Sequence, residues 1–252
     1  MSQILALRDR LSEPQRRTLK RAGTAALSVL PIRWNLELLA IRHGTDKWPQ
    51  GYISYYQRHF VPLRRRRLNL LEIGIGTLGP RNGGDSLRMW RDYFPRATIW
   101  GLDILDKSRH AGPRIRVLQG SQNDPELLRD VARRIGRIDI VIDDGSHVNE
   151  HVLTSFHTLF PLLATGGVYV IEDMVTSYYP KFGGNSRDLD DTGTMMNLVK
   201  RLCDHVNSAL IPNRTESPFD RIGEVHVYPG IAFIVKVPPK PFVAPSPFLG
   251  AP

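Results

Sequence analysis

The sequence has little cysteine, no long apolar run and no internal repeat. Its single cysteine, Cys203, excludes an intramolecular disulfide framework and is typical of a cytoplasmic protein. No stretch reaches the roughly 18 consecutive apolar residues that a membrane-spanning helix needs, so we expect no transmembrane segment. Zinc-finger spacing and the aromatic signature of RNA-binding modules are also missing. With 41% hydrophobic and 23% charged residues, the chain of 252 residues is suited to one globular α/β domain.

Basic residues exceed acidic ones and give the chain a formal net charge of +9. Such an excess is compatible with nucleic acid, a membrane surface or an acidic substrate as the partner. The densest basic run, Arg64–Arg67, stands directly before an apolar segment, where it fits a solvated approach to a strand. Residues 16–32 are basic and apolar, but they begin too deep in the chain for a signal peptide, and no small-residue cleavage site follows. We therefore expect residues 1–42 to form a helical lead-in.

Short apolar segments alternate with helical segments from residue 68 onward. This alternation predicts a mostly parallel sheet with helices on both faces. Pro229-Gly230 divides the segment 223–237 and predicts an antiparallel hairpin at one end of the sheet. Residues 238–252 hold six prolines and are expected to form an extended tail. The other predicted strands are 68–75, 98–104, 114–120, 138–144 and 167–174; the predicted helices are 85–94, capped by Asp85 or Ser86, 124–135, and 149–167, ended by a glycine pair.

A glycine-rich loop follows the first predicted strand. Gly74, Gly76 and Gly79 have the spacing G-x-G-x-x-G, and Asp103 ends the next strand. Taken alone, these residues fit a nicotinamide dinucleotide site. Two features argue against it: Glu72 makes the base of the loop acidic, and the helix begins too late to place its N-terminus under a pyrophosphate. A cationic nucleoside ligand without phosphate, S-adenosylmethionine, fits better, and the glycines would let it approach the backbone.

In this interpretation each strand end binds a different part of the cofactor. We expect Glu72 near the ammonium or sulfonium group and Asp103 on the ribose hydroxyls. Ser121 and Gln122, which follow the third predicted strand, are expected near the adenine. The structural alternative is that the glycines only make a tight turn and that Asp103 caps a helix.

Acidic residues also gather at the ends of two later predicted strands. Asp143 and Asp144 end the fourth strand, and Glu172 and Asp173 end the fifth. Because successive parallel strands are commonly neighbours, the four carboxylates should converge and would repel one another unless a cation lay among them. Oxygen ligands without cysteine favour Mg²⁺. The predicted ligands are Asp144, Glu172 and Asp173.

His147 lies three residues after Asp144, in the loop that leaves the fourth strand. A neutral imidazole at this place can take a proton from a hydroxyl held by the metal, so His147 is the predicted general base. The structural alternative makes Asp143 a helix cap, Asp173 an exposed turn residue and His147 a surface histidine.

Several motifs between residues 43 and 180 together resemble one known family. They are HGTDKW (43–48), GYISYYQRHF (51–60), LLEIGIG (70–76), GGDSLRMW (83–90), GLDI (101–104), GSQND (120–124), IDDGSH (142–147) and IEDM (171–174). The chain resembles the metal-dependent sugar O-methyltransferases typified by the macrocin and mycinamicin enzymes. Short actinobacterial members of that family act on mannose or rhamnose units of polysaccharides and glycolipids.

The resemblance implies a class I S-adenosylmethionine-dependent methyltransferase fold, which is Rossmann-like and has a seven-stranded mixed sheet. We expect this domain to span residues 43–237, between the lead-in and the proline-rich tail 238–252. The resemblance also implies that Asp144, Glu172 and Asp173 bind Mg²⁺, that His147 is the base and that Thr45 lies near the cofactor. The full set of predicted cofactor-binding residues is Thr45, Glu72, Gly74, Gly76, Ser86, Asp103, Ser121 and Gln122.

The sequence therefore predicts methyl transfer from S-adenosylmethionine to a sugar hydroxyl. The expected partner is a glycoside or oligosaccharide acceptor, either a mannoside or rhamnoside of a polysaccharide or glycolipid or a macrolide sugar, and not a nucleic acid. A homodimer is left open. Two alternatives remain at this point: an NAD-dependent oxidoreductase that uses the glycine loop, and a non-catalytic basic module that binds nucleic acid. The polar segment 176–193 is expected to be a lid whose Tyr178 and Tyr179 contact the substrate.

Overall fold

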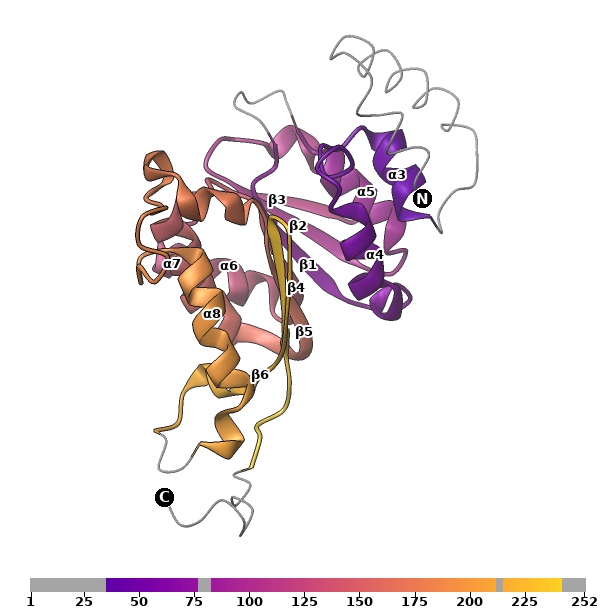
Figure 1. Ribbon diagram of the computed structural model, residues 1–252. Coiled ribbons are helices and arrows are strands. Elements are labelled where there is room, and N and C mark those ends of the chain that lie inside the picture. Colours follow the sequence, from indigo (N-terminus) through magenta and orange to yellow (C-terminus); the bar gives the residue numbers. More distant parts are fainter. Residues whose placement is uncertain (1–34, 77–82, 212–214, 242–252) are drawn as a thin grey trace. The chain divides into compact units, whose positions relative to one another are not determined.

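A mixed sheet of seven strands forms the larger of two units into which the described residues fall. The computed structural model describes residues 35–76, 83–211 and 215–241. The sheet unit holds 67–76, 96–211 and 215–241, and the smaller unit holds 35–66 and 83–95. In chain order, the strands are β1 Asn69–Ile73, β2 Thr98–Asp103, β3 Ile115–Gln119, β4 Ile138–Asp143, β5 Leu163–Ile171, β6 Ile222–Tyr228 and β7 Ile231–Lys236 (Figure 1).

The strand order places the ends of β1, β4 and β5 next to one another. The order is β3-β2-β1-β4-β5-β7-β6; the first five strands of the chain pair in parallel, and β7 runs antiparallel to both of its neighbours. This confirms the predicted seven-stranded mixed sheet with its antiparallel end. Ile73 pairs with Leu102 and with Asp143, and Asp143 pairs with Ile171, so four strands end at the same level. The residues that follow these strands emerge at one edge of the sheet, where open α/β sheets bind their ligands.

Three amphipathic helices cover one face of this sheet and enclose its core. They are α6 Pro125–Ile135, α7 Asn149–Leu159 and α8 Met195–Val206 (Figure 1). Asp124 caps α6 by accepting hydrogen bonds from the next turn, and Pro125 occupies the first helical position, as the sequence predicts. Apolar side chains of the three helices pack against inward-facing residues of β1, β4 and β5. The short 3-10 helices of this unit are η2 Ser108–His110, η3 Phe160–Leu162, η4 Met174–Tyr178, η5 Pro180–Phe182, η6 Ser208–Leu210 and η7 Pro218–Arg221.

The boundary between α7 and β5 differs from the prediction. The helix was expected to end at the glycine pair Gly166-Gly167, but it ends at Leu159 and β5 already begins at Leu163. Pro161 explains the earlier end, because proline cannot continue the hydrogen-bond ladder of a helix. The glycines lie inside β5, where the pairing with β4 is irregular, and a Cβ on Gly167 would come within 2.8 Å of two carbonyl oxygens. Gly167 therefore allows a close approach to Asp139 of β4, and the pair does not stop a helix.

The smaller unit is helical. Aromatic side chains hold it together: the ring centroids of Tyr56 and Trp90 are 4.9 Å apart, and those of Phe60 and Phe94 are 5.6 Å apart. Gly84, in a left-handed conformation, is the N-cap of the last helix, so the predicted cap at Asp85 or Ser86 is wrong by one residue or two. The elements are α3 Leu36–His43, α4 Ile53–Phe60, η1 Val61–Leu63 and α5 Asp85–Tyr93.

Parts of the predicted organisation lie outside the described residues. These are residues 1–34 of the helical lead-in, Gly79 of the glycine loop and residues 242–252 of the proline-rich tail. The domain limits at residues 43 and 237 stay predictions. Among the described helices, none combines the length and the apolar character that crossing a membrane would require.

Candidate active site

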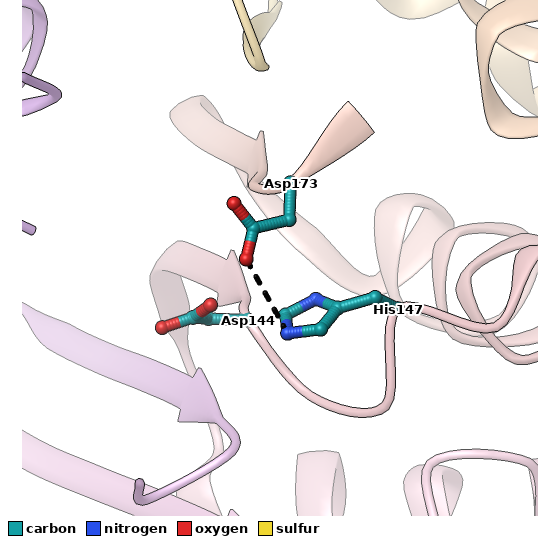
Figure 2. A group of neighbouring side chains, drawn as sticks. All are labelled: Asp144, His147 and Asp173. Atoms are coloured by element: carbon teal, nitrogen blue, oxygen red, sulfur yellow. Dashed lines mark ion pairs between the residues drawn. The ribbon is translucent and has the colours of Figure 1, made fainter. Parts of the chain in front are cut away.

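Two carboxylates and an imidazole meet at the edge where β4 and β5 end. Asp144 follows β4, Asp173 lies two residues beyond the end of β5, and His147 is in the loop between β4 and α7. One potential ligand atom from each of the three lies within 4.8 Å of the other two. The Nε2 atom of His147 is 3.4 Å from Oδ2 of Asp173 (Figure 2). The sequence prediction that the two strand ends bring these residues together is therefore matched by the geometry.

The backbone at this cluster adopts an uncommon conformation. In the described part of the chain, three residues other than glycine have a positive φ, and two of them are His147 at 57° and Asp173 at 51°. A left-handed conformation costs a residue with a Cβ about 1–2 kcal/mol, so surrounding contacts must hold it. Thr176 supplies one such contact, because its hydroxyl donates to the carbonyl oxygen of His147 at 2.9 Å. Strain of this kind concentrates at functional sites.

Asp143 does not belong to the cluster, contrary to the expectation that four carboxylates converge. Its side chain is buried and accepts hydrogen bonds from Gln122 at 2.9 Å, from Tyr169 at 3.1 Å and from Ser155. Burial raises the pKa of Asp143 to about 6, although these three hydrogen bonds act to lower it. Successive residues of a strand point to opposite faces, and Asp143 shares the face of the core residue Val141. Its role is structural.

The two glutamates of the prediction are both buried. Glu172 is 1% exposed and lies between β5 and Asp173, but it is not one of the three residues that lie within 4.8 Å of one another. Glu72 is fully buried in β1, on the opposite sheet face from the core residues Leu71 and Ile73. Their assignments, Glu172 to the metal and Glu72 to the cofactor, stay predictions.

The glycine loop packs directly against the loop that carries Asp144. A Cβ on Gly74, whose φ is +88°, would lie only 2.1 Å from the carbonyl oxygen of Asp144, so no other residue fits there. Asp103 fixes the same loop from the other side: its Oδ2 accepts from the amide of Ile75 at 2.9 Å, and its Oδ1 accepts from the amide of Leu105 at 2.8 Å. Asp103 is thus positioned at the edge, and each carboxylate oxygen has capacity for a further donor.

Ser121 and Gln122, which follow β3 and Gly120, differ in the hydrogen bonds that their side chains make. Ser121 is half-buried, and its hydroxyl accepts from the amide of Asn123 at 3.1 Å. Gln122 is buried and bonds to Asp143 and to the loop of His147. Thr45 and Ser86 belong to the smaller unit, and their predicted contacts with a cofactor stay predictions.

The sequence analysis missed Asn149, which fastens the segment after Asp173. Asn149 is fully buried, and its amide nitrogen donates to the carbonyl oxygens of Thr176 at 3.2 Å and Phe182 at 2.9 Å. Its Oδ1 accepts from the amide of Met195 at 2.8 Å. An asparagine at the start of a helix looks like an ordinary cap in the sequence, so no local signal distinguishes it. The predicted lid is therefore anchored at both of its ends to the first residue of α7.

Replacing Asn149 by alanine should lower the free energy of unfolding by roughly 2–4 kcal/mol, since two carbonyl groups and one amide would lose their partner. Chemical denaturation of the purified protein measures this. Asn185→Ala is the control, because Asn185 is only partly buried and bonds to Asp191, Arg187 and Asp188 within the segment, without joining it to α7. Equal stability of the two variants would contradict the anchoring role of Asn149.

Known proteins match most of the chain. Residues 51–174 match the family described as a methyltransferase domain. The 8-demethyl-8-alpha-L-rhamnosyl tetracenomycin-C 2'-O-methyltransferase of Streptomyces olivaceus is 49% identical over 204 residues, which cover 79% of this chain and 53% of that protein. The mycinamicin VI 2''-O-methyltransferase of Micromonospora griseorubida is 47% identical over 209 residues, or 80% of this chain and 52% of that protein. The structure of the MycE methyltransferase of mycinamycin biosynthesis, in complex with Mg, SAH and mycinamycin VI, aligns with a TM-score of 0.77 at 45% identity over 81% of this chain and 53% of that chain.

These relatives agree with the fold and with the resemblance of the motifs. The chain spans about half the length of the curated relatives it matches. Neither the oxidoreductase nor the nucleic-acid alternative gains support from them. The seven-stranded sheet, the cluster at its edge and these matches together identify the chain as a member of the family of the macrocin- and mycinamicin-type sugar O-methyltransferases.

Proposed function

We propose that this protein transfers a methyl group from S-adenosylmethionine to a sugar hydroxyl of a glycoside, with Mg²⁺ as its metal and His147 as its general base. The observation that carries the proposal is the juxtaposition of Asp144, His147 and Asp173 in a chain that is 49% identical to a rhamnosyl O-methyltransferase. The acceptor is a sugar on a polyketide, as in the relatives, or a mannoside or rhamnoside of a larger glycan. A cytoplasmic location is compatible with the single cysteine.

The donor set fits a hard divalent cation. Asp144 and Asp173 offer carboxylate oxygens, the donors that Mg²⁺ prefers, and both are half-buried. Glu172, next to Asp173 in the chain, is the predicted third oxygen ligand. Few protein ligands suit Mg²⁺, which keeps several waters or substrate oxygens in its octahedron.

The ends of β1 and β2 have features that suit the methyl donor. Gly74 and Gly76 both have positive φ and expose the backbone after β1, while Asp103 ends β2 with its carboxylate fixed by two amides. A carboxylate at the end of the second strand is the group that binds ribose hydroxyls in nucleoside sites of this topology. In the described residues, the next helix along the chain, α5, starts only at Asp85, whereas a dinucleotide site needs a helix that begins at the glycines.

Each residue of the cluster has its own role in the proposed reaction. When bound, Mg²⁺ supplies a positive charge that makes the acceptor hydroxyl easier to deprotonate. His147 takes the hydroxyl proton on Nε2, and Asp173, 3.4 Å away, stabilises the imidazolium that results. The acceptor oxygen forms its bond to the methyl carbon as the bond from sulfur to that carbon breaks, which releases S-adenosylhomocysteine. Holding the two reactants in line should provide several kcal/mol of the acceleration.

A screen with S-adenosylmethionine labelled in the methyl group tests the proposal. Rhamnosides, mannosides and macrolide glycosides serve as acceptors, and the matching aglycones without sugar serve as controls. Label should enter a sugar-bearing acceptor and not the free aglycone. Label on the aglycone, or on none of the acceptors despite cofactor binding, would reject sugar O-methylation.

Replacing Asp103 by alanine should weaken the binding of S-adenosylhomocysteine by at least about tenfold. The reason is the loss of charge-assisted hydrogen bonds to the ribose, each worth roughly 1.5–3 kcal/mol. Calorimetry on the folded protein measures the effect. Asp106→Ala is the matched control, because Asp106 is an exposed aspartate just beyond β2 whose side chain accepts from the amide of Ser108. An unchanged affinity in Asp103→Ala would remove Asp103 from the cofactor site.

A further inference from the structure

The side-chain amide of Gln122 makes its hydrogen bonds with buried groups of the protein. Its Nε2 donates to Asp143 at 2.9 Å and lies 3.4 Å from the hydroxyl oxygen of Ser155. Its Oε1 accepts from the amide of Ser146 at 2.7 Å, and the residue is 6% exposed. A primary amide has two N–H donors, and both are used here, so the side chain has no donor left for an adenine.

The loop from Asp144 to His147 packs against this side-chain amide. A Cβ on Gly145 would be only 2.0 Å from Oε1 of Gln122, so the contact depends on a glycine at that position. The loop carries one proposed metal ligand at its start and the proposed base at its end. Ser146, whose amide bonds to Gln122, lies directly before His147.

We propose that Gln122 is a positioning residue for the metal-binding loop 144–147, acting through Ser146 and Asp143, and that its side chain does not contact the adenine. This inference rests on the proposed function and changes the role that the sequence assigns to Gln122. Any contact of residue 122 with the cofactor would then come from its backbone.

The loop is held at three points, and Gln122 provides the middle one. The amide of Asp144 donates to the carbonyl oxygen of Ile73 at 3.0 Å, and the carbonyl oxygen of His147 accepts from the hydroxyl of Thr176 at 2.9 Å. Between them, the bond to Gln122 holds the backbone amide of Ser146, just before the left-handed residue His147. The hydroxyl of Ser146 also accepts from the amide of Val148 at 3.3 Å. The Nε2 end of the Gln122 side chain is fixed as well, because its acceptor Asp143 also accepts hydrogen bonds from Tyr169 and Ser155 in the core. Partners that orient the residues of a metal site tune its affinity for the metal. Gln122 would do so through Asp143 and Ser146, the chain neighbours of Asp144 and His147.

Gln122→Met tests the proposal, since methionine has a similar length and volume but makes no hydrogen bond of this kind. Thr154→Val is the matched control: it removes the 2.9 Å bond from Thr154 to Asn123, which also joins the segment after β3 to α7 but does not touch the loop. The probes are Mn²⁺ binding measured by electron paramagnetic resonance, S-adenosylhomocysteine binding measured by calorimetry, and hydrogen exchange of the peptide that contains Ser146.

We expect Gln122→Met to weaken Mn²⁺ binding by about 10- to 100-fold, the usual range for such partners, and to speed exchange at Ser146. The affinity for S-adenosylhomocysteine should stay within about twofold of the wild type, and Thr154→Val should match the wild type in all three measurements. Gln122→Glu should keep the slow exchange at Ser146, because a glutamate oxygen can still accept from its amide.

Two results would overturn the positioning role. One is normal Mn²⁺ affinity together with normal exchange at Ser146 in Gln122→Met. The other is a loss of S-adenosylhomocysteine affinity while Mn²⁺ affinity stays normal, which would place the side chain at the cofactor. If the wild-type protein binds no Mn²⁺, the metal part of the proposed function fails, and the exchange at Ser146 still decides the role of Gln122.

Discussion

Replacing His147 by alanine should reduce kcat by about 10²–10⁴-fold, the range typical of a positioned general base. The imidazole is the only group among the three clustered side chains that can take up a proton and remain paired to a carboxylate, through the 3.4 Å contact with Asp173. The affinity for S-adenosylhomocysteine should hardly change, because the proposed role of the imidazole is toward the acceptor. Steady-state kinetics at saturating Mg²⁺ and calorimetry measure the two quantities.

His226→Ala is the matched control for this experiment. His226 lies on the edge strand β6 and pairs with Glu224 at 2.6 Å, so its removal tests for a general effect of losing an exposed histidine. It should leave kcat near the wild-type value. A His147 variant with near-normal kcat, or one that loses cofactor binding and stability together with activity, would show that the histidine has a structural role only.

Removing divalent metal with a chelator should abolish turnover, and added Mg²⁺ should restore it. Without the metal, the negative charges of Asp144 and Asp173 would oppose deprotonation of the acceptor hydroxyl. Asp144→Asn and Asp173→Asn should each raise the Mg²⁺ concentration for half-maximal rate by at least about tenfold, since each replaces a charged ligand by a neutral one. The dependence of initial rate on Mg²⁺ concentration provides the measurement.

Asp188→Asn serves as the control for the two ligand variants. Asp188 is an exposed aspartate in the segment after Asp173, where it accepts a hydrogen bond from the amide of Asp190. Its substitution should not alter the metal requirement. Full activity of the wild-type protein in excess chelator would contradict the metal-dependent mechanism, and the paired carboxylates would then need another explanation.

The sequence predicted the strands and their shared edge because the signals for both are local. Apolar runs bounded by turn residues located β1 to β4 within about two residues, which is a normal error for strand ends. The presence of acidic residues directly after two such runs was enough to bring Asp144 and Asp173 together. The late start of the helix after the glycines, which argued against a dinucleotide, also agrees with α5.

The features that the sequence did not reveal depend on distant residues. Every residue of β4 is buried, including Asp139, so the run IDIVIDD does not show that Asp143 points into the core while Asp144 continues toward the edge. Asn149 bonds to residues 27 and 46 positions away, and Gln122 to residues 21 and 24 positions away. No periodicity or spacing in a single sequence reports such partners. The end of α7 was misplaced because a glycine pair that permits a close strand contact looks the same as one that ends a helix.

The left-handed backbone at His147 and Asp173 restricts how the site can evolve. Glycine, asparagine and aspartate occupy this conformation at the least cost, whereas β-branched residues are strongly disfavoured. At position 173, asparagine is then the one inexpensive replacement that retains an oxygen donor. At position 147, none of the inexpensive replacements carries an imidazole. A lineage, or a laboratory library, that exchanges the base must therefore take it from another position.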